Sequence, residues 1–121
     1  MGVDLVDVHA LEARFAARAA ILVEIFTDAE LAYCHRQAHP WPHLAARFAA
    51  KEALLKALTS GLTGAMRWRD IEVVRDPAGT PRLAVTGATA EMMVRAGLAP
   101  GSVSLSHTAD QAIAVVLLTP T

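Results

Sequence analysis

Four charged residues interrupt a segment, residues 44–58, that otherwise consists mostly of leucine, alanine and phenylalanine. At about 100° per residue, the leucines fall on one side of a predicted helix and the alanines fall on the opposite side. Because neither side is a solvated polar face, we expect the helix to be packed on both. Ionised groups in such a helix need partners, which indicates a site for an anion and a cation. The four residues are Arg47, Lys51, Glu52 and Lys56.

Two carboxylates form the first candidate constellation, Asp4 near the start of the chain and Glu52 in the long helix. Mg²⁺ takes oxygen ligands, often only one or two from the protein, and leaves other positions for phosphate and water. The alternative is that Asp4 is an exposed strand residue and Glu52 pairs with Lys56 one turn on. The sequence separation of Asp4 and Glu52 favours this alternative, because pairs of acidic residues that far apart are common and do not by themselves indicate a metal site.

Two basic residues form the second constellation, because Arg47 and Lys51 lie one helical turn apart and would project together. Such a pair suits a phosphate, with arginine acting as a fork and lysine as a point charge. The alternative is that their aliphatic stems cover the core while their charged ends reach water. Without further information, the alternative is the commoner arrangement.

The third candidate is the end of a predicted strand, the segment Ser104-Leu-Ser-His107-Thr108. His107 could act as an acid or base or donate to a phosphate, and Thr108 could donate its hydroxyl and its backbone N–H. The alternative is a strand-end histidine whose ring forms hydrogen bonds only to the backbone.

A fourth candidate is the pair Arg14 and Arg18, which could dock an acidic partner or simply form a solvated face.

The elements that must position these residues alternate between strands and helices. Helical spacing, a Thr27–Glu30 capping box, and the turn residues at 76–79 place their boundaries. The resulting order is βαααββαββ, which indicates an α+β fold with a largely antiparallel sheet. The predicted segments are a strand at 2–8, helices at 10–23, from 28, and at 43–59, strands at 70–75 and 82–86, a helix at 88–95, and strands at 102–107 and 112–118.

Composition excludes several classes of protein. At 121 residues the chain is long enough for one domain, 1–121, with a real core. No apolar run approaches the roughly 20 residues of a membrane span. A net charge of −1 and 5% aromatic residues argue against nucleic-acid binding. A single cysteine, Cys34, favours a reducing cytoplasm, and 54% hydrophobic residues favour a buried subunit interface.

Six motifs, in order, resemble those of the small holo-acyl-carrier-protein synthase type of 4′-phosphopantetheinyl transferase. The resemblance covers nearly the whole chain, and the fourth-helix motif is its most distinctive part. Any one motif is weak evidence, whereas six in the expected order are strong evidence. The motifs are Gly2-Val-Asp4, Ile25-Phe-Thr27 with Glu30-Leu and Tyr33-Cys34, Arg47-Phe-Ala-Ala-Lys-Glu52, Trp68-Arg-Asp70-Ile-Glu-Val73, Gly79-x-Pro81, and Ser104-Leu-Ser-His107-Thr108.

The resemblance implies an activity and a set of roles. Members of this family transfer the phosphopantetheine arm of coenzyme A to a serine of an apo acyl carrier protein, and they require Mg²⁺. Small members are similar in forming homotrimers with sites between subunits. By resemblance, Asp4 and Glu52 bind the metal, and Arg14 and Arg18 dock the carrier. The catalytic residues implied are Glu52, Lys56 and His107, and those around the coenzyme A phosphates are Arg47, Lys51, Lys56, His107 and Thr108.

Several points stay open at the level of sequence. The base that activates the serine is Glu52, a metal-bound water or His107, and the carrier could belong to a fatty-acid, polyketide or other pathway. A non-catalytic subunit that binds carrier proteins is one alternative function. A metal-dependent phosphohydrolase acting on nucleotides is another.

Overall fold

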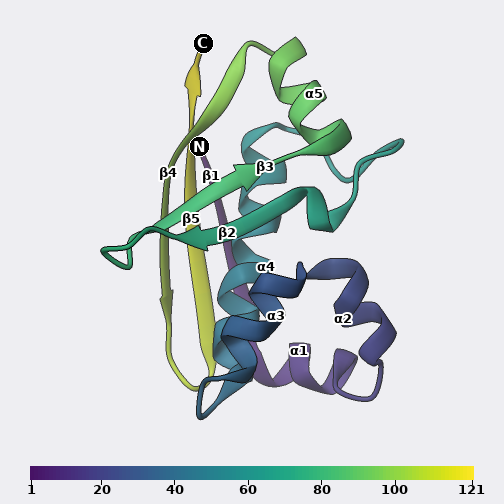
Figure 1. Ribbon diagram of the computed structural model, residues 1–121, viewed down its shortest axis with the longest axis vertical. Helices are drawn as coiled ribbons and strands as arrows, with labels where there is room; N and C mark the ends of the chain where they lie inside the picture. Colours follow the sequence, from purple (N-terminus) through teal and green to yellow (C-terminus); the bar gives the residue numbers. More distant parts are fainter.

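The computed structural model describes all residues, 1–121, as an α+β fold (Figure 1). The fold class and the order of elements predicted from the sequence are confirmed. The elements are β1 (Gly2–Asp7), α1 (Val8–Phe15), α2 (Ala19–Ile25), α3 (Asp28–His35), α4 (Pro40–Ala57), the 3₁₀ turn η1 (Trp68–Asp70), β2 (Ile71–Arg75), β3 (Pro81–Val85), α5 (Gly87–Arg95), β4 (Leu98–His107) and β5 (Gln111–Pro120).

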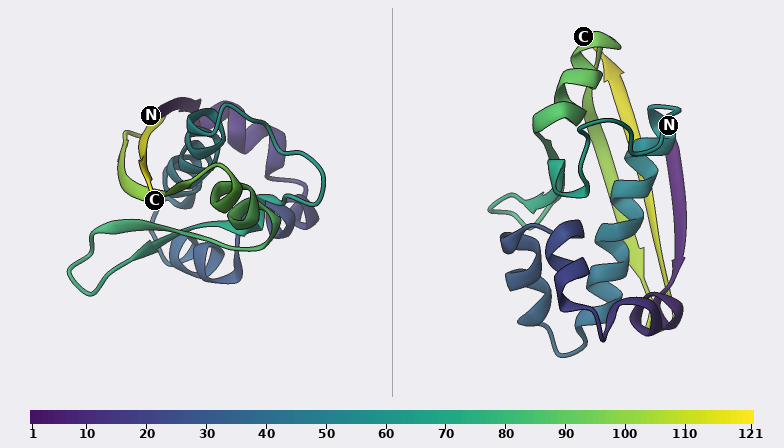
Figure 2. Two further views of the ribbon diagram at one scale, coloured as in Figure 1. Left: turned by 90° about the horizontal axis from the view of Figure 1, so that it is seen from above. Right: turned by 90° about the vertical axis from the view of Figure 1, so that its right-hand side faces the viewer.

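Helix α4 runs through the centre of the molecule and is packed on two sides, as its sequence predicts. One side lies along a three-stranded antiparallel sheet of order β1-β5-β4 (Figure 2). The other side contacts α1, α3 and strand β2 of the separate β2–β3 hairpin. Elements on both sides therefore fix the directions in which the side chains of α4 point.

The alanines of α4 allow this helix and strand β1 to approach very closely. A Cβ atom added to Gly2 would lie 1.9 Å from the carbonyl oxygen of Ala53, a separation that no side chain could occupy. On β5, the inward-facing residues Ala112, Ala114 and Val116 are also small and buried. The sheet and the helix thus meet through a smooth surface of small residues.

The opposite face of the same sheet is apolar and uncovered. Val3 pairs across the strands with Val115, and Leu5 pairs with Ile113. The exposed fractions are 52% for Val3 and 61% for Leu5, and Leu117 on β5 is 45% exposed. Large apolar patches on a protein of this size commonly mark an interface, so this outer face of β1 and β5 has the character of a contact surface.

One segment predicted as a single helix, 10–23, is divided into α1 and α2. Arg18 lies between them with a backbone outside the helical region (φ −128°, ψ 67°). The residues here favour a helix locally, so tertiary packing decides the break: Phe15 before it and Ile25 after it are both 5% exposed in the same core. Helix α4 also begins earlier than predicted, at Pro40, because proline is tolerated in the first turn.

Two local predictions are confirmed. Helix α3 begins at Asp28 behind a capping box in which the Thr27 and Glu30 side chains each accept a backbone N–H of the other. The hairpin turn closes through Asp76, and Gly79 takes the left-handed conformation that glycine permits (φ 87°). None of the helices is long and apolar enough to cross a lipid bilayer.

Candidate functional site

The acids singled out from the sequence converge on one cavity, which we call the acid cavity. It has a volume of about 360 Å³, lies between α1, β1 and α4, and is lined by Asp4, Glu52 and Lys56 among others. Asp4 reaches it from β1, while Glu52 and Lys56 lie one turn apart on α4. The fold therefore brings together two carboxylates that are distant in sequence.

Lys56 pairs across the acid cavity rather than along its own helix. Its Nζ atom donates to Asp4 Oδ1 at 2.7 Å and more weakly to the Val3 carbonyl oxygen at 3.4 Å. No hydrogen bond within the chain ends on the Glu52 carboxylate. The simpler alternative, in which Glu52 is occupied by Lys56, is therefore not the arrangement that forms.

The electrostatics of the acid cavity favour an additional positive charge. Burial raises the pKa of Glu52, the charge of Asp4 raises it further, and Lys56 and Arg14 oppose the shift. The hydrogen bond to Asp4 also raises the pKa of Lys56. No group of three or more histidine, cysteine or acidic residues could hold a metal ion. A pair of carboxylates nevertheless suits Mg²⁺, which often binds through one or two of them.

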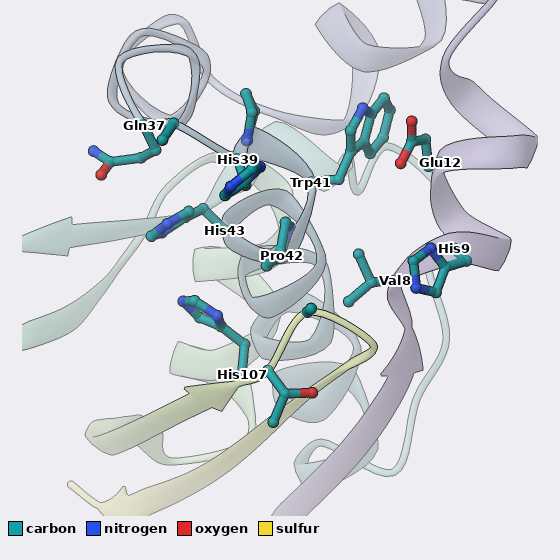
Figure 3. A pocket seen from close by; sticks show the side chains of 13 residues that line it. Val8, His9, Glu12, Gln37, His39, Trp41, Pro42, His43 and His107 are labelled. Atoms are coloured by element: carbon teal, nitrogen blue, oxygen red, sulfur yellow. The ribbon is translucent and has the colours of Figure 1, made fainter.

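A second, larger cavity of about 700 Å³ lies between the start of α1, residues 37–43 and the β4–β5 turn. We call it the histidine cavity, since His9, His39, His43 and His107 all line it (Figure 3). The His43 and His107 rings lie edge to face with their centroids 4.6 Å apart. His107 comes from the end of β4 and His43 from the first turn of α4, so the fold brings these two elements together here.

Two arginines, Arg47 and Arg75, lie near the His43–His107 pair, and no carboxylate forms a salt bridge with either of them. The Arg47 guanidinium lies 4.3 Å from the centre of the Tyr33 ring, and that of Arg75 lies 5.3 Å from the same ring. Neither arginine takes part in any of the four salt bridges of the chain. We call Arg47, Arg75, His43 and His107 the cationic cluster.

The cationic cluster has the properties of an anion site. Burial lowers the pKa of His43, and the neighbouring His107, Arg47 and Arg75 lower it further. Arg47 is 2% exposed, its Nε atom has no partner, and its Nη1 atom makes only a 3.3 Å bond to the His43 carbonyl oxygen. Arg47 and Arg75 line neither cavity, so their charge would attract a phosphate held at His43 and His107 without contacting it directly.

Thr108 closes the turn beside His107. Its hydroxyl oxygen accepts the N–H groups of Asp110 and Gln111, each at 3.1 Å, and its own N–H donates to the Gln111 carbonyl oxygen. Only the hydroxyl proton of Thr108 is therefore left for a ligand. The turn is also held by His9, whose Nε2 atom lies 2.8 Å from Asp110 Oδ1, a hydrogen bond that raises the pKa of His9.

The structure corrects the expectation for Lys51. The Lys51 side chain is fully buried, lines neither cavity, and bonds to Glu30 at 2.8 Å. Its ammonium group therefore faces the protein interior and presents no free N–H to a coenzyme A phosphate.

The two arginines expected to dock a carrier do not form one helical stripe, because α1 ends at Phe15. Arg14 lines the acid cavity, whereas Arg18 is exposed between α1 and α2.

Cys34 is buried, and burial raises the pKa of its thiol to about 11, so it is no nucleophile at neutral pH.

Sequence reasoning missed His43, Tyr33 and Arg75 as neighbours of the candidate site. His43 and Arg47 are four residues apart on one helix, and this spacing was a signal that could have linked them. Arg75 lies on β2 and contacts Tyr33 of α3, and no local sequence pattern predicts that contact.

The acid cavity and the histidine cavity are separate within one chain. Helix α1 contributes to both, with Val8, His9 and Glu12 lining the histidine cavity and Ala10, Leu11 and Arg14 lining the acid cavity. No residue lines both. The residues expected to act together thus form two halves on either side of α1.

Known proteins match the chain over nearly its whole length. The 4′-phosphopantetheinyl transferase superfamily matches residues 1–116. The holo-[acyl-carrier-protein] synthase of Geotalea daltonii is 42% identical over 119 residues, which cover 97% of this chain and 94% of that protein.

Solved structures agree with the sequence comparison. The holo-[acyl-carrier-protein] synthase of Neisseria meningitidis is 31% identical with a TM-score of 0.83, over 98% of this chain and 95% of that one. The Helicobacter pylori synthase, solved in complex with coenzyme A, is 28% identical with a TM-score of 0.82, over 98% of both chains. The fold, the ordered motifs and these matches agree, and the chain belongs to the 4′-phosphopantetheinyl transferase superfamily.

Proposed function

We infer that the protein is a holo-acyl-carrier-protein synthase, which transfers 4′-phosphopantetheine from coenzyme A to a serine of an apo acyl carrier protein. The observation that carries this conclusion is the convergence of Asp4, Glu52 and Lys56 on one cavity of this fold. The relatives named above bear the same activity in their names, and one of them was solved with coenzyme A bound.

The acid cavity supplies the ligands for a divalent cation. Asp4 and Glu52 would hold Mg²⁺, whose charge, when bound, offsets that of the pyrophosphate of coenzyme A. The raised pKa of Glu52 supports this role, because burial and then the charge of Asp4 disfavour its ionised form, and a bound cation would offset both. Lys56, already fixed by Asp4, lies beside the same acids and would stabilise charge that develops on the leaving group.

In the reaction, the serine oxygen forms a bond to the phosphorus that carries the pantetheine arm. The bond from that phosphorus to adenosine 3′,5′-bisphosphate breaks, and the serine proton passes to a base. Glu52 and His107 are the candidate bases of this chain, and they lie in different cavities. The cationic cluster and the Thr108 hydroxyl would bind phosphate groups of coenzyme A.

The protein acts as a homotrimer in this proposal, with each site built by two subunits. Two features support it: the expected site residues are divided between separate cavities, and the outer face of β1 and β5 exposes Val3, Leu5 and Ile113. Association through this face would bury the exposed apolar surface. It would also bring the acid cavity of one copy to the cationic cluster of its neighbour.

The carrier protein would approach the acid cavity, because its serine must reach the reacting phosphorus there. Arg14 lines that cavity and could bind an acidic residue of the carrier next to the serine. Arg18, exposed beyond the end of α1, would contribute longer-range attraction.

A mass-shift assay tests the function. The protein is mixed with coenzyme A, Mg²⁺ and a panel of apo carrier proteins, and each carrier is weighed. Gain of the phosphopantetheine mass is expected for at least one carrier. Carrier binding without any mass gain would indicate the non-catalytic subunit, and phosphate release without a carrier would indicate a hydrolase; either result would contradict the proposal.

A further inference from the structure

Lys51 and Glu30 form an ion pair in the interior of the protein. Lys51 is 0% exposed and Glu30 is 1% exposed, and Lys51 Nζ lies 2.8 Å from Glu30 Oε1. Lys51 belongs to α4 and Glu30 to the first turn of α3. The pair therefore joins the two helices at a point that solvent does not reach.

Each charged group of the pair has several further bonds. Lys51 Nζ also donates to the carbonyl oxygens of Trp68, at 3.2 Å, and Ile71. The Glu30 carboxylate accepts the N–H of Thr27 at 3.0 Å and the N–H of Val73 at 2.9 Å. The network thus ties α4 to three places at once: the cap of α3, the η1 turn and strand β2.

This network is poorly explained by stability alone. Replacing a complete buried ion pair with apolar residues is often neutral or stabilising, so such a pair is weak evidence for net stabilisation. What directional bonds supply is a fixed geometry. Helix α4 meets the sheet through small residues, which make no directional bonds, so the network adds directional bonds to the packing that positions this helix.

We propose that the Glu30–Lys51 pair is a positioning device that sets the rotation of α4 and thereby aims Glu52, the next residue, at the cation in the acid cavity. The inference rests on the proposed function of Glu52 as a metal ligand. A side chain end roughly 6 Å from the helix axis moves by about 1 Å for every 10° of rotation. A displacement of that size can cost about 100-fold in rate.

The test compares a neutralised pair with a matched control. In the double variant Lys51→Met with Glu30→Gln, no unpaired charge is left inside, so the protein is expected to fold. Leu54→Ala, also on α4 and fully buried, lowers stability by opening a cavity without touching the network. Unfolding curves, Mn²⁺ affinity by electron paramagnetic resonance, and steady-state kinetics are measured for each, at temperatures where each is folded.

We expect the double variant to lose about 100-fold in kcat and about 10-fold in Mn²⁺ affinity, with KM for coenzyme A nearly unchanged. Leu54→Ala should lose stability but keep both kcat and Mn²⁺ affinity. Wild-type kcat and Mn²⁺ affinity in the double variant would overturn the positioning role. A higher KM for coenzyme A with unchanged kcat would also overturn it, because Lys51 would then act as a phosphate ligand. Absence of Mn²⁺ binding in the wild type would instead contradict the proposed function of Glu52.

Discussion

The acid cavity and the cationic cluster lie on either side of α1 and differ in how their charges are balanced. In the acid cavity, Lys56 bonds to Asp4, and Glu52 keeps no hydrogen bond within the chain. In the cationic cluster, Arg47, Arg75, His43 and His107 have no carboxylate bonded to them. The difference shows how one chain can keep opposite charges apart, so that each stays available for a ligand. In the proposed homotrimer, a ligand and a second subunit would connect the two regions.

The largest effect is expected from separating the subunits, which leaves both regions intact but keeps them apart. Leu117→Glu places a charge on the outer face of β5, where the side chain is 45% exposed and lines neither cavity, so the monomer should still fold. Light scattering should then show monomers, and transfer activity should fall by at least 100-fold, on the order of the loss of a positioned partner. Val94→Glu on α5, at a residue 76% exposed, is the matched control and should change neither. A fully active Leu117→Glu monomer would contradict the shared site.

Within the acid cavity, Glu52→Gln removes a metal ligand and should lower kcat on the order of 1000-fold. Burial and the charge of Asp4 both raise the pKa of Glu52, so a neutral amide removes both unfavourable effects, and the melting temperature should stay the same or rise. The carrier mass assay and calorimetry measure both quantities. Full activity in this variant would remove the metal assignment.

Within the cationic cluster, Arg47→Met should act on binding rather than on chemistry. We expect KM for coenzyme A to rise about 10-fold, equivalent to about 1.4 kcal/mol, because an uncompensated positive charge next to His43 is lost. The value of kcat at saturating coenzyme A should change much less than in Glu52→Gln. If both variants lowered kcat alone, the proposed division of roles between the two regions would be wrong.

Much of this division follows from local patterns, and the rest depends on contacts that are distant in sequence. The Thr27–Glu30 capping box and the two-sided packing of α4 follow from short-range spacing and are confirmed. The partner of Lys51 is Glu30, 21 residues away, and only the assembled fold reveals that this lysine is buried. The break near Arg18 is also set by packing, since the residues around it favour a helix.

The smallest effect expected is on the titration of His43. Folding lowers its pKa from the usual 6.5, so the stability associated with its neutral form is present above about pH 6.5 and is lost as pH falls through the folded-state pKa. Adenosine 3′,5′-bisphosphate should raise the pKa of His43, because phosphate charge opposes that of Arg47, Arg75 and His107. Histidine ring signals followed by NMR across pH measure the shift. An unchanged pKa at saturating ligand would place the phosphates elsewhere.

Subunit complementation tests the central claim most directly. Glu52→Gln chains are co-expressed with chains that carry Arg47→Met and His107→Ala, and the mixed oligomers are assayed beside each parent. If two subunits share each site in a cyclic trimer, random mixing in equal amounts restores about a quarter of the wild-type sites, although both parents are nearly inactive. Activity no higher than that of the parents would show that one chain supplies both halves of its own site.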